Sequence, residues 1–141
     1  MGKRVIWDGL CCVEIPQDWS VSEEQGVITI CGENGVGALQ LSFASRERKG
    51  SVEASEPLEL MSSWTHSRGF MDVGLKQVRL GGGHAAECQY IEESEDGPTF
   101  WHVWSIVGEN RAALITYVSE AADSGIEKVE REQIVASFSW L

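Results

Sequence analysis

Three histidines are the side chains in this sequence best suited to acid-base or metal chemistry. His66, His84 and His102 are expected on a helix, after a glycine turn and in the middle of a strand. A zinc site would need them to converge with a cysteine or an acid, and no local spacing brings them together. We therefore predict no metal ion and no cofactor. His102, between Trp101 and Val103, is expected to be a hydrogen-bonded residue of a sheet.

The nucleophiles and carboxylates also lack a catalytic spacing. Ser67 follows a histidine directly, but neighbours on a helix diverge, and no G-x-S-x-G turn occurs. The acid pairs at 23–24 and 92–93 are expected in turns, whereas a glycosidase pair faces a cleft. The glycine-rich stretches 32–37 and 81–83 each join two strands, whereas a phosphate loop leads into a helix. The sequence thus predicts a protein that is not an enzyme.

Four cysteines, Cys11, Cys12, Cys31 and Cys88, stand in apolar segments that favour strands. We predict reduced thiols that pack as small apolar side chains. A shared metal ion is disfavoured because no C-x-x-C pair occurs. Cys11 and Cys12, as neighbours in a strand, also point to opposite faces.

The composition indicates one acidic domain. The chain has 141 residues, 43% of them hydrophobic, and 11 Lys+Arg against 22 Asp+Glu give a formal net charge of -11. That length predicts a single domain over residues 1–141. The charge argues against nucleic acid as a partner because it repels phosphate. Neither a signal peptide nor an apolar run of about 18 residues is present, so we expect a cytoplasmic protein without a membrane span.

The periodicity predicts the elements that must position these residues. Strands are expected over 10–15, 27–31 and 38–43, with an Asn-Gly hairpin signal at 34–35. A helix follows, capped by Ser55 and closed by Gly69. Four further strands are expected over 73–80, 84–92, 99–107 and 112–118. A second helix should run from an S-x-x-E capping box at 124–127 to about Phe138, with Ile126, Val129, Ile134, Ala136 and Phe138 on its apolar side.

This order of elements predicts the α+β class. We expect a continuous central antiparallel sheet of about 6–7 strands, flanked by helices on one or both faces. On the aromatic strand 99–107, Trp101 and Trp104 are an odd number of residues apart and must lie on opposite faces. If helices cover both faces, Trp101 belongs to the core; if they cover one face, one of the two tryptophans is exposed.

The tryptophans are the strongest indication of a binding surface. There are six tryptophans in the chain, and exposed tryptophan inside a polar rim is frequent where proteins bind one another. We predict binding through Trp101 and Trp104, with Arg46, Arg48 and Lys49 or the acidic loop 92–96 as a charged rim. The remaining candidate contacts are His102 and Trp140.

The segment 13–19, Val-Glu-Ile-Pro-Gln-Asp-Trp, resembles the opening strand and turn of the Mog1/PsbP-like superfamily. Residues 134–138, Ile-Val-Ala-Ser-Phe, are similar to its closing pattern. The resemblance implies an α/β/α sandwich around an antiparallel sheet. It also implies a binding or assembly protein, since members include a Ran-GTPase-binding factor, photosystem subunits, DcrB-like proteins and chaperones of secreted toxins. Lacking an export signal, the chain is most similar to the cytosolic chaperone branch.

Together these observations predict a non-enzymatic, cytosolic protein-binding domain that acts as an adaptor, chaperone or immunity-type partner. Its acidic surface favours a basic or apolar protein partner. An alternative is a small-molecule-binding protein or hydrolase with a pocket between sheet and helix, holding His102 or His84 beside a carboxylate. A third possibility is a homodimer in which edge strands of two copies pair.

Overall fold

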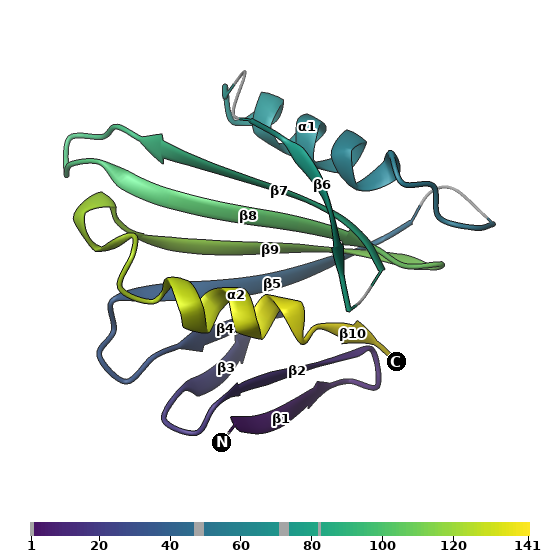
Figure 1. Cartoon of the computed structure of the whole chain (residues 1–141), viewed down its shortest axis with the longest axis horizontal. Helices are drawn as coiled ribbons and strands as arrows, with labels where there is room; N and C mark the ends of the chain where they lie inside the picture. Colours follow the sequence, from purple (N-terminus) through teal and green to yellow (C-terminus); the bar gives the residue numbers. More distant parts are fainter. Residues whose placement is uncertain (1, 47–49, 71–73, 82) are drawn as a thin grey trace.

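A seven-stranded antiparallel sheet forms the centre of the computed structural model, which describes residues 2–46, 50–70, 74–81 and 83–141. The strand order is β3-β4-β5-β9-β8-β7-β6 (Figure 1). The strands are β3 (Ser20–Glu24), β4 (Val27–Cys31), β5 (Gly37–Ser45), β9 (Arg111–Glu120), β8 (Thr99–Val107), β7 (Gly83–Glu92) and β6 (Lys76–Leu80). The α+β class and the antiparallel sheet are confirmed, and β8 has the predicted bounds.

A second, three-stranded sheet corrects the expectation of one continuous sheet. Its order is β1 (Gly2–Trp7), β2 (Cys11–Pro16) and β10 (Ser139–Trp140), with β2 in the middle. β1, β3 and β10 were not predicted. β3 is almost entirely polar and β10 has two residues, so neither shows a hydrophobic period. In β1 exposed and half-buried residues alternate and end in the half-buried Trp7, but the charged Lys3 and Arg4 make this alternation hard to recognise in the sequence.

Two helices and one short 3-10 turn complete the part of the chain that the structure describes. α1 (Glu56–Ser67) has the predicted position, although Ser55 makes no side-chain capping bond. The turn Ala121–Asp123 precedes α2 (Lys128–Ala136), which starts later than predicted. The expected apolar side of α2 is partly wrong, since Ala136 is exposed and Ile126 and Val129 are 60% and 61% exposed. Ile126 and Val129 lie before or just inside the first turn of the helix, and the buried Phe138 lies after its end.

The large sheet separates two cores. One lies between the sheet, α2 and the small sheet, and it contains Trp104 and Phe138. The other lies between α1 and β7–β8, and Trp101 packs at its border. The two tryptophans therefore do lie on opposite faces of β8. Cys11, Cys12 and Cys88 are buried and all four cysteines are unbridged, as predicted, but Cys31 is only half-buried.

Candidate functional site

One face of the large sheet is covered over only half of its width. α1 makes its main contacts with β6, β7 and β8, and Figure 1 shows it at that side of the sheet. Ala113, Ile115 and Tyr117 of β9 point into the α2 core, so the residues between them point to the α1 face. Nine side chains of β9, β5 and β4 that point to the α1 face are half-buried or exposed. We call this surface the open face; it comprises Val27, Thr29, Cys31, Ala38, Gln40, Ser42, Leu114, Thr116 and Val118.

The strand register aligns the open face in rows of small side chains. Thr29 pairs with Gln40, which pairs with Thr116. Cys31, Ala38 and Val118 form the next row, and that row continues into Trp101 of β8. None of the nine residues of the open face carries a formal charge at neutral pH. The result is a neutral, weakly apolar platform on a strongly acidic protein.

An aromatic and ionic cluster borders the open face on the side of α1. The guanidinium of Arg68 lies 4.5 Å from the ring centre of Trp101 and 5.1 Å from that of Trp64. The Trp101 Nε1–H donates to a carboxylate oxygen of Glu92 at 3.3 Å. Trp101 also stacks on Tyr90, whose pKa burial raises to about 12. Trp101 is thus partly covered by α1 and partly open, between the two alternatives that the sequence left.

Acidic side chains gather at the end of the open face where β9 and β7 meet their loops. Glu120 pairs with Thr99, and Thr99 pairs with Glu92. The Ala121 N–H donates to the Pro98 carbonyl at 3.1 Å and so joins the two loops. We call this region the acidic end; its acids are Glu92, Glu93, Glu95, Asp96, Glu120 and Asp123. Four of these six side chains are exposed, namely Glu93, Glu95, Asp96 and Glu120.

Trp104 and His102 form no surface, which corrects their prediction as contacts. Trp104 is 2% exposed and His102 is not exposed at all. Both side chains point to the face of β8 that α2 and the small sheet cover, because the even-numbered residues of this strand face that core. Their rings stack with centres 3.8 Å apart. The expectation that His102 is a hydrogen-bonded sheet residue is confirmed.

His102 bonds to two oppositely charged groups, the buried Arg131 and the half-buried Glu87. Its Nε2 lies 2.8 Å from Glu87 Oε2, and its Nδ1 accepts from Arg131 Nε at 3.2 Å. Burial lowers the pKa of His102, and it also lowers that of Arg131. The hydrogen bond from His102 lowers the pKa of Glu87 to about 2. Arg131 can donate to Nδ1 only if this nitrogen carries no proton, so the ring is neutral and donates from Nε2.

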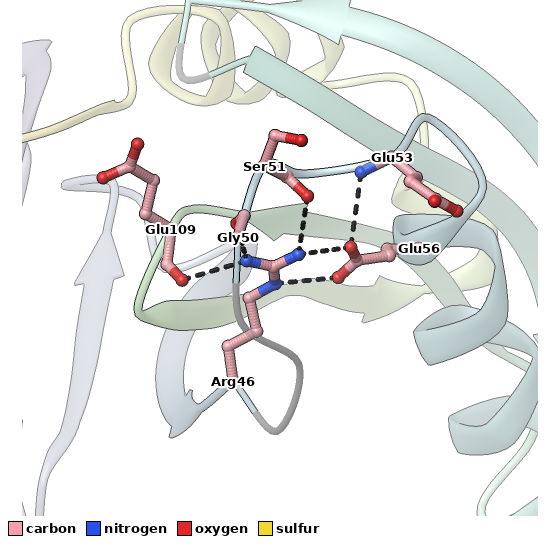
Figure 2. A network of polar contacts seen from close by, with 6 residues as sticks. All are labelled: Arg46, Gly50, Ser51, Glu53, Glu56 and Glu109. Atoms are coloured by element: carbon pink, nitrogen blue, oxygen red, sulfur yellow. Dashed lines mark hydrogen bonds and ion pairs between the residues drawn. The ribbon is translucent and has the colours of Figure 1, made fainter.

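Arg46 also lies inside the structure, which corrects its prediction as part of an exposed rim. Its side chain is 4% exposed and forms a two-point ion pair with Glu56 (Figure 2). Its remaining donors reach the carbonyls of Gly50, Ser51 and Glu109. All five guanidinium N–H groups are therefore used. Arg46 fastens the loop before α1 to the β8–β9 turn, and its glutamate partner raises its pKa. Arg48 and Lys49 lie outside the described residues.

Trp140 lines an open cavity of about 420 Å³ beside that loop. Leu10, Val52, Val107 and Leu141 give it an apolar lining, and Glu109, Asn110 and Arg111 stand at its border. Arg46 holds two walls of this cavity, because it bonds to the carbonyls of Ser51 and Glu109. Trp140 therefore lies near Arg46, at a distance from Trp101, and the predicted contact residues do not form one surface.

A cavity of about 410 Å³ lies between β2 and α2, where the alternative hypothesis places a pocket. Glu14, Glu130 and Gln133 line it, but neither His102 nor His84 does. His84 instead approaches Arg79 at 3.1 Å. The histidine–carboxylate pair required by the hydrolase hypothesis is thus present as His102–Glu87, but neither this cavity nor the one at Trp140 is lined by it.

Within residues 2–46, 50–70, 74–81 and 83–141, no group of three or more His, Cys, Asp or Glu side chains could hold a metal ion. In the same part of the chain, no helix has the length and apolar character needed to cross a membrane.

The open face, with its aromatic border and acidic end, was not predicted from the sequence. Its residues come from three strands, and none of them shows a distinctive pattern on its own.

Sequence comparisons give no relative. No family model matches the chain, and no curated protein matches it. Solved structures do match over nearly its whole length. A crystal structure from Bacteroides thetaiotaomicron VPI-5482 has a TM-score of 0.75 at 17% identity; the alignment covers 99% of this chain and 48% of that one. This chain therefore spans about half the length of that protein.

Two further neighbours have names. Cyanobacterial PsbP from Synechocystis sp. PCC 6803 has a TM-score of 0.70 at 9% identity, with 99% of this chain and 92% of that chain covered. The Ran-binding protein Mog1p from Saccharomyces cerevisiae has a TM-score of 0.61 at 9% identity, with 98% and 94% covered. The chain has the Mog1/PsbP-like fold, as the motif at residues 13–19 predicted.

Proposed function

We propose that this chain is a non-enzymatic protein-binding domain, an adaptor or chaperone of the cytosol, that holds its partner on the open face. One observation supports this proposal above the others: α1 covers only the β6–β8 side of a seven-stranded sheet. An antiparallel sheet that leaves part of one face to solvent normally carries polar or charged side chains there. Here nine uncharged side chains remain half-buried or exposed, and all of them except Leu114, which also packs against the α1 core, are free for a second molecule to cover.

The comparisons agree with a binding role at the level of the fold. Mog1p, which shares this fold, is named a Ran-binding protein. The acid-base chemistry of this chain also favours binding over catalysis. The His102–Glu87 pair has its hydrogen-bonding capacity used by Arg131 and Lys76, and the histidine ring is sealed from solvent. A general base needs access to its substrate.

Affinity capture from the source organism tests the proposal. Gln40 is exposed in the centre of the open face, and Gln133 is exposed on α2, away from that face. Gln40→Arg should remove the captured protein, whereas Gln133→Arg, the matched control, should retain it. Quantitative mass spectrometry of the two eluates gives the measurement. If every captured protein is retained equally by both variants, the open face is not the binding surface.

A further inference from the structure

We infer that the partner presents a cationic amphipathic helix, which lies on the open face beside α1 and directs basic residues to the acidic end. This inference rests on the proposed function and specifies the chemistry of the partner. Three properties of the open face support it: its dimensions, the neutrality of its centre and the charge of its border.

The dimensions of the open face fit one helix. On β5 the same face continues past Ser42 to the exposed Ala44, so from Ala38 to Ala44 it advances six residues, or roughly 20 Å along the strand. A helix of about 13 residues has that length, and α1, which covers the other half of the same face, has 12 residues. Across the strands, β4, β5 and β9 span about 10 Å, the approximate diameter of a helix with its side chains.

The centre of the open face favours an apolar contact without charge. Ala38, Leu114 and Val118 supply apolar surface, and Thr29 and Thr116 supply methyl groups. A charged side chain buried there would lose its hydration without gaining an ion-pair partner. The contacting side of the occupant must therefore be small and apolar, while its other side remains in water. That pattern is an amphipathic helix.

The border determines the charge of the occupant. Six acids lie at the acidic end, and four of them are exposed to solvent. Basic residues at the end or flanks of a docked helix would be attracted there, and this attraction would also accelerate association. A second copy of this chain is a poorer occupant. Each copy carries a formal charge of -11, so two copies repel one another.

Fluorescence anisotropy with labelled synthetic peptides tests the inference. The probe is a peptide of about 14 residues with Ala and Leu on one helix face and Lys on its flanks; the matched peptide carries Glu in place of Lys. We expect only the Lys peptide to bind the wild-type chain. Gln40→Arg and, as a second variant, Thr116→Arg should abolish this binding. The double variant E95Q/E120Q should weaken it roughly fivefold.

The matched control E14Q/E132Q changes the net charge by the same amount on exposed residues away from the open face. Its affinity for the Lys peptide should stay within about twofold of wild type. Equal weakening by both double variants would overturn the inference, as would equal binding of the Glu peptide. Absence of binding at about 1 mM Lys peptide would also overturn it. A dimer in light scattering that Gln40→Arg dissociates would assign the open face to a second copy.

These outcomes separate the inference from the proposed function. If native capture depends on Gln40 but the Lys peptide does not bind, the open face binds a protein of other chemistry. The proposed function then stands and the inference fails. If capture does not depend on Gln40, the proposed function fails, whatever the peptides do.

Discussion

The ring of His102 stands between the buried guanidinium of Arg131 and the half-buried carboxylate of Glu87, with one of them on each ring nitrogen. We predict that His102→Ala lowers the free energy of unfolding by about 3 kcal/mol, because Arg131 is left in the core without its acceptor. Urea denaturation followed by tryptophan fluorescence measures the change. His84→Ala, on a partly exposed histidine, is the control and should change stability by less than about 0.5 kcal/mol. Equal losses for both variants would contradict this role.

The same residues predict the pH dependence of stability. The pKa of His102 is lowered from 6.5 by burial, so the unfolded chain takes up the proton first. Stability is then full above pH 6.5 and falls below it, by up to about 1.4 kcal/mol per pH unit. The lowered pKa of Glu87 adds a second loss from pH 4.5 towards about 2. Urea midpoints from about pH 7.5 to about pH 5 should fall in wild type, and much less in His102→Gln. An equal slope in the variant would disprove the assignment.

At the scale of elements, α2 begins where a buried glutamate ends the preceding turn. The capping box predicted at 124–127 does not form, because the Glu127 carboxylate accepts from the Tyr117 hydroxyl at 2.7 Å. Arg131 donates to the Ser124 carbonyl and secures the same turn. The S-x-x-E pattern is present, but the Glu127 side chain that the capping box requires bonds to Tyr117 instead.

This contact gives a prediction for α2. Tyr117→Phe should lower the free energy of unfolding by about 1–3 kcal/mol, because Glu127 stays buried without its donor. Glu127→Gln retains a carbonyl acceptor and should be less destabilising. Urea denaturation of both variants and of the double variant gives the coupling energy. A Tyr117→Phe loss no larger than that of Glu127→Gln would show that the hydroxyl bond does not stabilise the start of α2.

Elements with a regular hydrophobic period could be predicted from the sequence, and the candidate site could not. β8 and α1 follow from alternation and from helical spacing. Arg46 illustrates the limit, since a basic residue in a polar loop gives no sign that Glu56 and three carbonyls will enclose it. The open face depends on which strands α1 covers. That is a property of tertiary packing, which local periodicity does not encode.

For the whole molecule, the excess of acids predicts a response to salt. The formal charge of -11 and the clustering at the acidic end make the folded state repel itself. Raising NaCl from about 10 mM to about 150 mM shortens the screening length from about 30 Å to about 8 Å. We expect the free energy of unfolding to rise by about 0.5–1 kcal/mol. A decrease, measured by urea denaturation at both concentrations, would show that attractive ion pairs dominate.

The position of β2 between β1 and β10 affects the order in which the two cores can form during synthesis. Cys12 contacts Ser139, 127 residues further along the chain, and Trp140 pairs with Cys11. During synthesis the α1–β7–β8 core is complete in sequence once Val107 has emerged. The larger core still lacks Phe138 at that point, as well as the strand that seals β2. Such distant pairing slows folding. The larger core therefore stays unfinished until β10 has been synthesised, later than every other strand of the two sheets.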